Sequence, residues 1–234
     1  MDIQDEFIST VSHELRTPLT SIRGFAQTLL SSWDKIDDEN KKKFIKIIEG
    51  QSNRLINLVE NILTVSKTGN IVFTKVDVNS AIKKIIPIFK ESYKTHKIEL
   101  HFNAIPPFAR LDEDKFQQIM TNLIDNGCKY SPENSTVKIT TEVNKNSIKI
   151  SVQDEGVGIR ECDREKLFKK FSRLENHLTS KTQGNGLGLY ITKQIVESMN
   201  GNIDFNSDGV KGTTFTVVFP VYNEEEALRC LQKS

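Results

Sequence analysis

The sequence predicts an α+β protein with two parts: an N-terminal helical hairpin, then an α/β two-layer sandwich with helices on one face of a sheet. Up to residue 67, apolar side chains recur at a helical period. Beyond residue 70, segments of helical period alternate with segments of period two. Between these regions, Thr68-Gly69-Asn70 interrupts the helical pattern, as expected at a domain boundary.

Residues 3–31 predict an amphipathic helix, because one set of apolar side chains falls within about 100° of arc. This apolar stripe contains Ile8, Val11, Leu15, Pro18, Ile22, Phe25, Ala26 and Leu29. His13 lies nearly opposite the centre of the stripe, and Thr17 lies within about 40° of His13. We therefore expect the imidazole of His13 to face solvent, where a second domain could reach it.

A second helix is predicted over residues 39–67, after a turn at 33–38 in which Asp37 or Asp38 caps the helix. Its heptad seam has members spaced alternately by four and three residues: Phe44, Ile48, Gln51, Leu55, Leu58, Ile62 and Val65. Two long helices leave too much apolar surface for one hairpin, so we expect a homodimeric four-helix bundle. The alternative is a monomeric hairpin packed on its own downstream domain.

The second part of the chain combines helices and strands in one layered domain. The period of the pattern predicts helices at 78–94, 112–130 and 187–199, and strands at 71–76, 98–102, 136–143, 147–154, 202–207 and 213–220. Residues 224–234 are expected to form a short helix or a tail.

The residues around His13 suit nucleophilic phosphoryl chemistry. A neutral imidazole is nucleophilic near physiological pH, and Glu14 could take up the proton released as a phosphoramidate forms. Without further motifs, an ordinary surface histidine on an amphipathic helix would be the preferred interpretation of these residues; the motifs downstream reverse that preference.

One side of the predicted helix at 112–130 carries a polar stripe of Gln118, Asn122, Asn126 and Lys129. Asparagine is a poor helix former, so two asparagines on this stripe suggest a binding role. Asn126 could offer an oxygen to Mg²⁺, Lys129 a charge to a phosphate, and Tyr130 a ring on which a base packs. The alternative is a solvated stripe on the surface.

Two glycine motifs follow. Asp154-Glu155-Gly156-Val157-Gly158-Ile159 comes directly after a predicted strand, where the carboxylate could accept a hydrogen bond from the adenine amine. The run from Gly184 to Leu189 opens the helix at 187–199, whose free amides attract phosphate. The loop between them carries Phe168, Phe171, Arg173 and Lys181, and its length suggests a lid over a nucleotide. The two phenylalanines equally suit plain packing.

Composition and charge exclude several classes of function. The chain carries 32 basic and 31 acidic residues, which gives no reason to expect a nucleic-acid or membrane partner. Cys128, Cys162 and Cys230 lack metal-ligand spacing, so we expect reduced thiols in a cytoplasmic compartment. No apolar run suits a signal peptide or membrane span. We therefore expect no membrane contact by this chain, whether it is free or the cytosolic part of a membrane-anchored receptor.

These motifs, in this order, resemble the transmitter core of the sensor histidine kinases of two-component signalling. Ser12 to Leu19 (SHELRTPL) resembles the H box, Asn122 to Ser131 the N box, and Asp154 to Ile159 the first glycine box. The F box, the second glycine box and the closing strand motif are matched by Phe168 to Phe171, Gly184 to Leu189 and Gly212 to Phe215. The resemblance covers roughly residues 3–220.

The resemblance implies a dimerisation and phosphotransfer hairpin at 1–68, a Bergerat-type ATP-binding domain at 71–222 and a tail at 223–234. His13 would accept the γ-phosphoryl group of ATP and pass it to an aspartate in the receiver domain of a response regulator. Glu14 would accept the proton, and Thr17 would serve a phosphatase reaction on the regulator. The implied ATP-binding residues are Asn122, Asn126 (through Mg²⁺), Lys129, Tyr130, Asp154, Gly156, Gly158, Ile159, Phe171, Arg173, Gly184, Gly186, Leu187, Gly188, Leu189 and Thr213.

Two rival functions are an ATP hydrolase and a catalytically silent nucleotide-binding scaffold. Related ATPases such as gyrase carry a glutamate at the position of Asn122, and an amide cannot act as that base. The substitution therefore favours transfer to His13 over hydrolysis. No residue favours the scaffold, because His13, Asn126, Asp154 and the glycines are all present. One departure from the family is Gly127, where alanine is usual; a mid-helix glycine costs about 1 kcal/mol.

Overall fold

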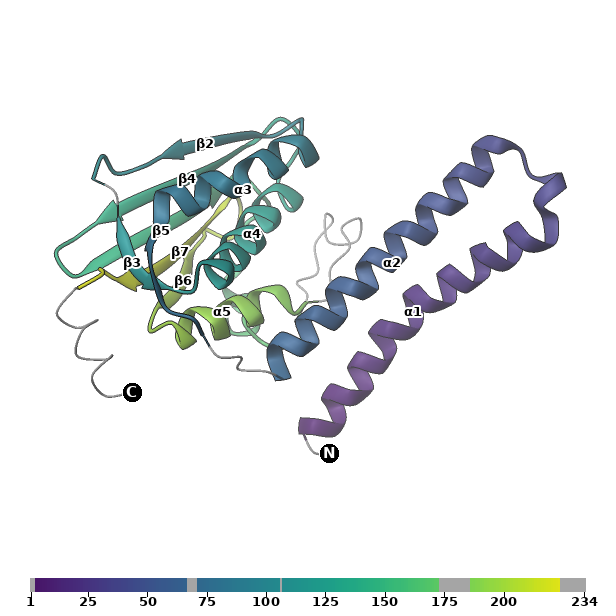
Figure 1. Ribbon diagram of the computed structural model, residues 1–234, viewed down its shortest axis with the longest axis horizontal. Coiled ribbons are helices and arrows are strands. Elements are labelled where there is room, and N and C mark those ends of the chain that lie inside the picture. Colours follow the sequence, from purple (N-terminus) through teal and green to yellow (C-terminus); the bar gives the residue numbers. More distant parts are fainter. Residues whose placement is uncertain (1–2, 67–70, 106, 173–185, 224–234) are drawn as a thin grey trace. The chain divides into compact units, whose positions relative to one another are not determined.

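The computed structural model describes the backbone of residues 3–66, 71–105, 107–172 and 186–223, and the chain divides into two compact units, 1–67 and 68–234. The first unit is an antiparallel hairpin of α1 (Ile3–Ser32) and α2 (Asp38–Ser66), joined by the 3-10 helix η1 (Trp33–Lys35) (Figure 1). Asp37 caps α2 by accepting hydrogen bonds from the backbone and side-chain N–H groups of Asn40, at 2.8 and 2.7 Å. These bonds lower the pKa of Asp37.

The hairpin buries few side chains by itself. Leu29 and Leu58 are buried, and the rings of Phe25 and Phe44 pack with centroids 5.1 Å apart. A row of apolar side chains on α2 is about half exposed: Ile45, Ile56, Val59 and Leu63. At about 100° per residue these four fall within about 60° of arc, so they form one stripe along α2, named here the exposed stripe.

The second unit is built on a five-stranded sheet. Its strand order is β2 (Lys97–His101), β4 (Thr136–Val143), β5 (Ser147–Asp154), β7 (Thr213–Pro220) and β6 (Asn202–Asn206). Neighbouring strands are antiparallel, except that β2 and β4 are parallel. Burial alternates along β4, β5 and β7, as expected for a sheet with one covered face.

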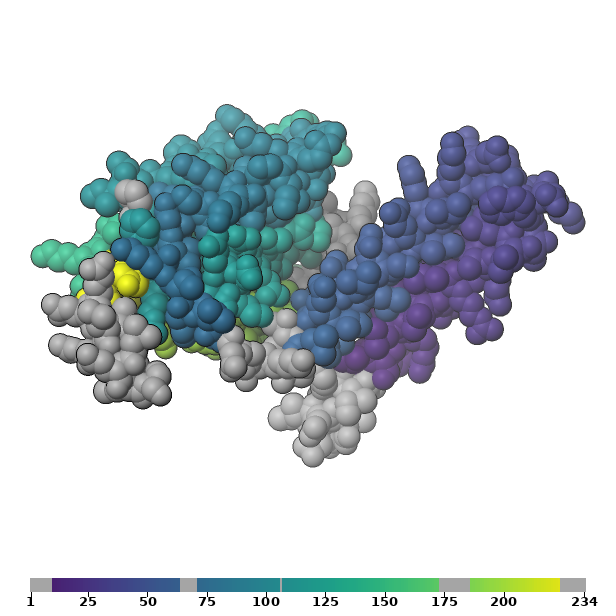
Figure 2. Space-filling view, viewed as in Figure 1, coloured from purple at the N-terminus to yellow at the C-terminus, as the bar shows by residue number. Residues whose placement is uncertain are grey.

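Helices α3 (Val78–Ser92), α4 (Glu113–Lys129) and α5 (Gly188–Ser198) cover one face of this sheet (Figure 1). In the space-filling view, the blue and teal residues of α3 and α4 hide most of the strands behind them (Figure 2). The core lies between the two layers, where the ring of Phe116 from α4 meets Phe219 from β7 with centroids 6.1 Å apart. The predicted two-layer α+β architecture is confirmed.

A separate two-stranded ribbon was only half predicted. The strand expected at 71–76 is β1 (Thr74–Asp77), which pairs antiparallel with β3 (Phe108–Leu111), a strand that the sequence pattern did not indicate. β3 has only four residues, too few for a period-two signal, and it is defined by its partner. The predicted long loop also contains a short 3-10 helix, η2 (Glu161–Lys166). Other described elements match their predictions within two residues at each end.

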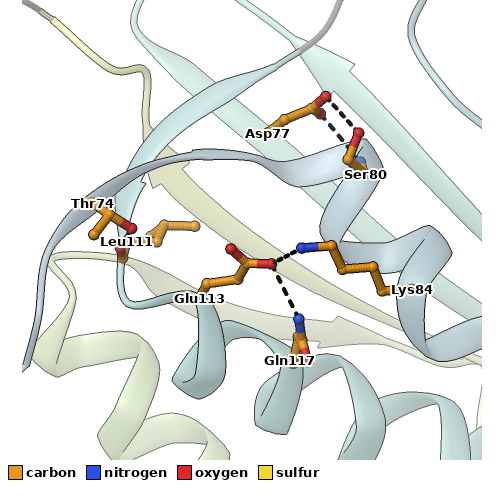
Figure 3. Close-up of polar contacts among 7 residues, drawn as sticks. All are labelled: Thr74, Asp77, Ser80, Lys84, Leu111, Glu113 and Gln117. Atoms are coloured by element: carbon orange, nitrogen blue, oxygen red, sulfur yellow. Dashed lines mark hydrogen bonds and ion pairs between the residues drawn. The ribbon is translucent and has the colours of Figure 1, made fainter.

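Polar contacts fix α3 and α4 at this ribbon (Figure 3). Asp77 caps α3 by accepting hydrogen bonds from the N–H of Ser80 at 3.2 Å and from its hydroxyl at 2.7 Å. Lys84 of α3 forms an ion pair with Glu113 of α4 at 2.6 Å, and the amide of Gln117 donates to the same carboxylate at 3.3 Å. These contacts join α3 to the ribbon at its N-terminus and to α4 along its side.

Within the described residues, no helix has the length and apolar character needed to cross a lipid bilayer.

Candidate functional site

His13 lies on α1 with its side chain exposed, and its imidazole forms no hydrogen bond with any described residue. One turn further along, the hydroxyl of Thr17 donates to the backbone carbonyl of His13 at 3.3 Å. Thr17 is exposed as well, whereas Pro18 is buried. The helix thus presents His13 and Thr17 to solvent and turns its apolar stripe inward, as its periodicity predicts.

Glu14 is held by the opposite helix of the hairpin. Its Oε2 lies 3.1 Å from Nη2 of Arg54 on α2, and the side chains are only 29% and 23% exposed. Arg54 was not identified from the sequence, because a heptad pattern does not indicate which side chain of one helix pairs with a carboxylate on the other helix. The proposed proton acceptor is therefore part of an interhelical ion pair.

Asn122 joins α4 to α5. Its amide donates to the hydroxyl of buried Thr192 at 2.7 Å. A Cβ added at Gly188, the first residue of α5, would lie 2.4 Å from Oδ1 of Asn122, so only glycine allows this approach of the two helices. The structure thus gives both residues a packing role that the motif alone did not indicate, and it identifies Thr192 as a partner that was missed.

The C-terminal turn of α4 carries the remaining residues of the polar stripe. The half-buried amide of Asn126 has no hydrogen-bond partner in the described part of the chain. Lys129 forms an ion pair with Asp125, which also accepts the hydroxyl hydrogen of Tyr93 at 2.6 Å. The pKa of Tyr93 is raised mainly by burial and further by this hydrogen bond to Asp125. Lys129 is therefore already paired, while the side chain of Asn126, as far as the described residues show, can bind a ligand.

Asp154, at the end of β5, is a buried carboxylate with one free oxygen. Its Oδ1 accepts the backbone N–H groups of Gly156 at 2.8 Å and Thr213 at 3.1 Å. Burial raises the pKa of Asp154 to about 6, although these two hydrogen bonds act in the opposite direction. Oδ2 has no hydrogen-bond partner among the described residues, so it can accept a further donor such as an exocyclic amine.

Backbone contacts hold the glycine motif beside Asp154. Gly156 accepts the N–H of Gly212 at 2.7 Å, and Ile159 donates its N–H to the hydroxyl of Ser207 at 2.9 Å. Gly158 has φ +68°, and an added Cβ would lie 2.9 Å from the backbone nitrogen of Val210. Val157 donates its N–H to the carbonyl of Tyr130, the C-cap of α4, at 3.3 Å. The end of α4, the 154–159 loop and the turn between β6 and β7 thus form one cluster, in which Ser207 was missed from the sequence.

The described ends of the proposed lid lie close together. An added Cβ at Gly186 would be 2.7 Å from the carbonyl carbon of Phe171, so these two backbones are in contact. The ring of Phe168 packs on Phe205 with centroids 6.2 Å apart, which confirms the packing alternative for Phe168. Leu187 is buried and Leu189 half-buried. The predicted site residues Arg173 and Gly184, and Lys181 of the lid, lie outside the described residues.

The donor set suits a magnesium ion shared with phosphates rather than an ion held by protein alone. The described residues contain no group of three or more His, Cys, Asp or Glu side chains that could enclose a metal. Mg²⁺ bound with a nucleotide commonly takes only one or two protein oxygens. The unpartnered side-chain oxygen of Asn126 fits that arrangement. Cys128 is a buried thiol whose pKa is raised to about 12, mainly by burial, so it is not a thiolate ligand.

Two family models match the chain, one for each unit. Residues 3–71 match the His Kinase A (phospho-acceptor) domain, and residues 111–223 match the histidine kinase-, DNA gyrase B- and HSP90-like ATPase. The sensor histidine kinase WalK of Bacillus subtilis is 36% identical over 94% of this chain and 37% of its own length. ArlS of Staphylococcus epidermidis is 34% identical over 94% of this chain and 49% of its own length.

Solved structures give the same result. A complex of the histidine kinase ThkA with the response regulator protein TrrA has a TM-score of 0.76 at 27% identity, covering 93% of this chain and 61% of that one. The Acinetobacter baumannii histidine kinase AdeS has a TM-score of 0.70 at 25% identity, covering 90% and 98%. The chain spans less than half the length of the two sequence relatives. With both domain types in this order, the chain belongs to the sensor histidine kinases of two-component systems.

Proposed function

We propose that the chain is the catalytic core of an ATP-dependent protein-histidine kinase that phosphorylates itself on His13. It then passes the phosphoryl group to an aspartate in the receiver domain of a response regulator. The observation that carries this proposal is the exposed imidazole of His13, which has no partner among the described residues. The second unit of the same chain holds Asp154, whose Oδ2 is likewise without a partner in the described part and suits an adenine amine.

In this proposal the cluster around Asp154 binds ATP. Asp154 accepts the adenine amine on Oδ2 while Thr213 orients its other oxygen. The remaining contacts come from the end of α4, the glycine loop and the start of α5, where the first-turn amides have no side-chain cap among the described residues. These contacts are assigned to Asn122, Lys129, Tyr130, Gly156, Gly158, Ile159, Phe171, Arg173, Gly184, Gly186, Leu187, Gly188 and Leu189.

The reaction forms one bond and breaks one. The lone pair of one imidazole nitrogen of His13 attacks the γ-phosphorus, and the bond to the bridging oxygen breaks, so that its electron pair leaves with ADP. The proton on the other ring nitrogen passes to the carboxylate of Glu14, which leaves a neutral ring carrying the phosphoryl group. Mg²⁺, which Asn126 would hold, supplies charge neutralisation on the phosphates.

The second half of the proposed function concerns the response regulator. A kinase of similar structure, ThkA, has been solved with a response regulator protein, which supports such a partner for this chain. The exposed hydroxyl of Thr17, one turn from His13, is proposed to orient water when the regulator is dephosphorylated. The proposed domain limits are 1–68 for the hairpin, 71–222 for the ATP-binding domain and 223–234 for the tail.

We further propose that two copies of the hairpin form a four-helix bundle in the cytoplasm, where ATP is available. The exposed stripe on α2 supports the dimer, because Ile45, Ile56, Val59 and Leu63 would otherwise remain about half exposed. The rival function, steady ATP hydrolysis, is disfavoured by the hydrogen bond between Asn122 and Thr192. An amide in this contact cannot remove a proton from water.

The test is incubation of the purified chain with γ-labelled ATP and Mg²⁺. The wild type is expected to acquire acid-labile, base-stable label, and His13→Gln to acquire none. His101→Gln is the matched control, because His101 is also an exposed histidine but lies on β2. Chelation of Mg²⁺ is expected to prevent labelling.

Three results would overturn the proposal: label retained in His13→Gln, label mapped to another residue, or continuous phosphate release without labelled protein. The last result would favour the ATP hydrolase.

A further inference from the structure

The ion pair between Glu14 and Arg54 links the residue beside the proposed phosphoacceptor to the other helix of the hairpin. Nη2 of Arg54 lies 3.1 Å from Oε2 of Glu14. Both side chains of this pair are less than one-third exposed. In most other ion pairs of the described residues at least one side chain is more exposed; in Lys94–Glu91, for example, the two side chains are 70% and 79% exposed. A partly buried charged pair is held more firmly than an exposed one, because water competes less for its charges.

The helix itself does not aim Glu14 at His13. Consecutive residues on a helix point about 100° apart, so their side chains do not face each other. A glutamate has several rotamers, and one that must meet a neighbouring imidazole needs a further contact to select among them. In this hairpin the contact comes from Arg54. It uses Oε2 only, and Oε1 has no partner among the described residues.

We propose that Arg54 is a positioning residue for autophosphorylation, acting through Glu14; this rests on the proposed function. The guanidinium holds the carboxylate by Oε2 and compensates for its lost hydration, so that Oε1 is presented to the imidazole proton of His13. When the proton moves, Glu14 becomes neutral while His13 gains a dianionic phosphoryl group. The fixed positive charge of Arg54 then compensates for the new negative charge one residue away.

The experiment is a double-mutant cycle on the rate of His13 labelling at saturating ATP. Arg54→Met, which keeps the length of the side chain, is expected to lower the rate about tenfold or more, because misplaced general bases lose rate on this scale. Arg54→Lys retains the charge and is expected to recover most of the rate. The KM for ATP is expected to stay unchanged, because Arg54 acts on the proton and not on the nucleotide.

The decisive variant is Arg54→Met combined with Glu14→Gln. If Arg54 acts through Glu14, the double variant is no slower than Glu14→Gln alone. The matched control is Lys46→Met, which removes an exposed cation from the same helix and is expected to label at the wild-type rate. If circular dichroism shows that Arg54→Met unfolds the hairpin, Arg54→Gln replaces it in the same cycle.

Two results would overturn the inference: an Arg54→Met rate equal to wild type, or an equal further loss in the Glu14→Gln background. The second would mean that Arg54 supports the hairpin or binds phosphate independently of Glu14. A wild type that is not labelled on His13 would instead overturn the proposed function itself, and the inference with it.

Discussion

The two units of this chain bury their apolar residues very differently. In the described hairpin, few apolar side chains are buried, among them Pro18, Leu29 and Leu58, while Ile56 stays 55% exposed. In the described part of the second unit, α3, α4, α5 and most strands contribute fully buried side chains, such as Phe116 and Phe219. The second unit therefore closes its own core, whereas the hairpin leaves apolar side chains exposed, as expected if it forms the proposed dimer.

The largest expected effect concerns the exposed stripe. Ile45→Glu combined with Ile56→Glu places two charges on the surface proposed to face the second copy, and burying unpaired charges there is costly. The double variant is expected to sediment as a monomer and to lose helical content, while its second unit still binds ATP. Analytical ultracentrifugation and circular dichroism measure both properties.

The matched control is Ile88→Glu, because Ile88 is 65% exposed on α3 of the second unit. This variant is expected to remain a dimer. A double variant that still sediments as a dimer would show that the exposed stripe is not the interface.

The next largest effect is expected from a change in the second unit that weakens ATP binding and leaves the hairpin unchanged. In Asp154→Asn, the side chain offers the adenine amine either an uncharged oxygen, which is a weaker acceptor, or an NH₂ group, which is itself a donor. The variant is expected to weaken ATP binding at least about tenfold. The dimer is expected to persist, because Asp154 belongs to the second unit. Calorimetric titration measures the affinity. Asp114→Asn, an exposed carboxylate on α4, is the control and is expected to bind ATP normally.

Acidification gives the same site an independent test. Because burial raises the pKa of Asp154 to about 6, the free protein takes up a proton there as the pH falls through this value. The adenine amine donates a hydrogen bond and needs the ionised carboxylate. Affinity is therefore expected to be constant above this range and to fall about tenfold per pH unit below it. The dependence should disappear in Asp154→Asn; if it persists there, another group controls it.

The smallest effect compares one glycine from each unit. A Cβ at Gly24 on α1 would meet nothing within 4 Å, so Gly24→Ala is expected to stabilise the hairpin by about 1 kcal/mol. A Cβ at Gly127 on α4 would lie 3.3 Å from Cγ1 of buried Val137, which must move. Gly127→Ala is therefore expected to gain less. Denaturant unfolding measures the change in the free energy of unfolding for each variant. An equal gain in stability would mean that Val137 can move away from the added methyl group at little cost.

Sequence reasoning recovered the elements whose signal is local. The helices at α1, α2 and α4 and the paired strands β4 and β5 follow from apolar periods that a single segment contains. β3 was missed because its four residues form a strand only through their pairing with β1. In the site, the motifs indicated Asp154 and the glycines, but Thr192, Ser207 and Arg54 were missed because they carry no motif of their own.

The order of the motifs by itself determined the family, the two-part organisation and the face of α1 on which His13 lies, because each of these depends on spacing along one chain. Only the tertiary structure decided that Glu14 is paired with Arg54, and that Thr213 holds Oδ1 of Asp154 while Oδ2 has no partner among the described residues. Each of these two contacts joins residues at least 40 positions apart in the chain. The partner of a charge, and hence its chemistry, is set by packing and not by the charge itself.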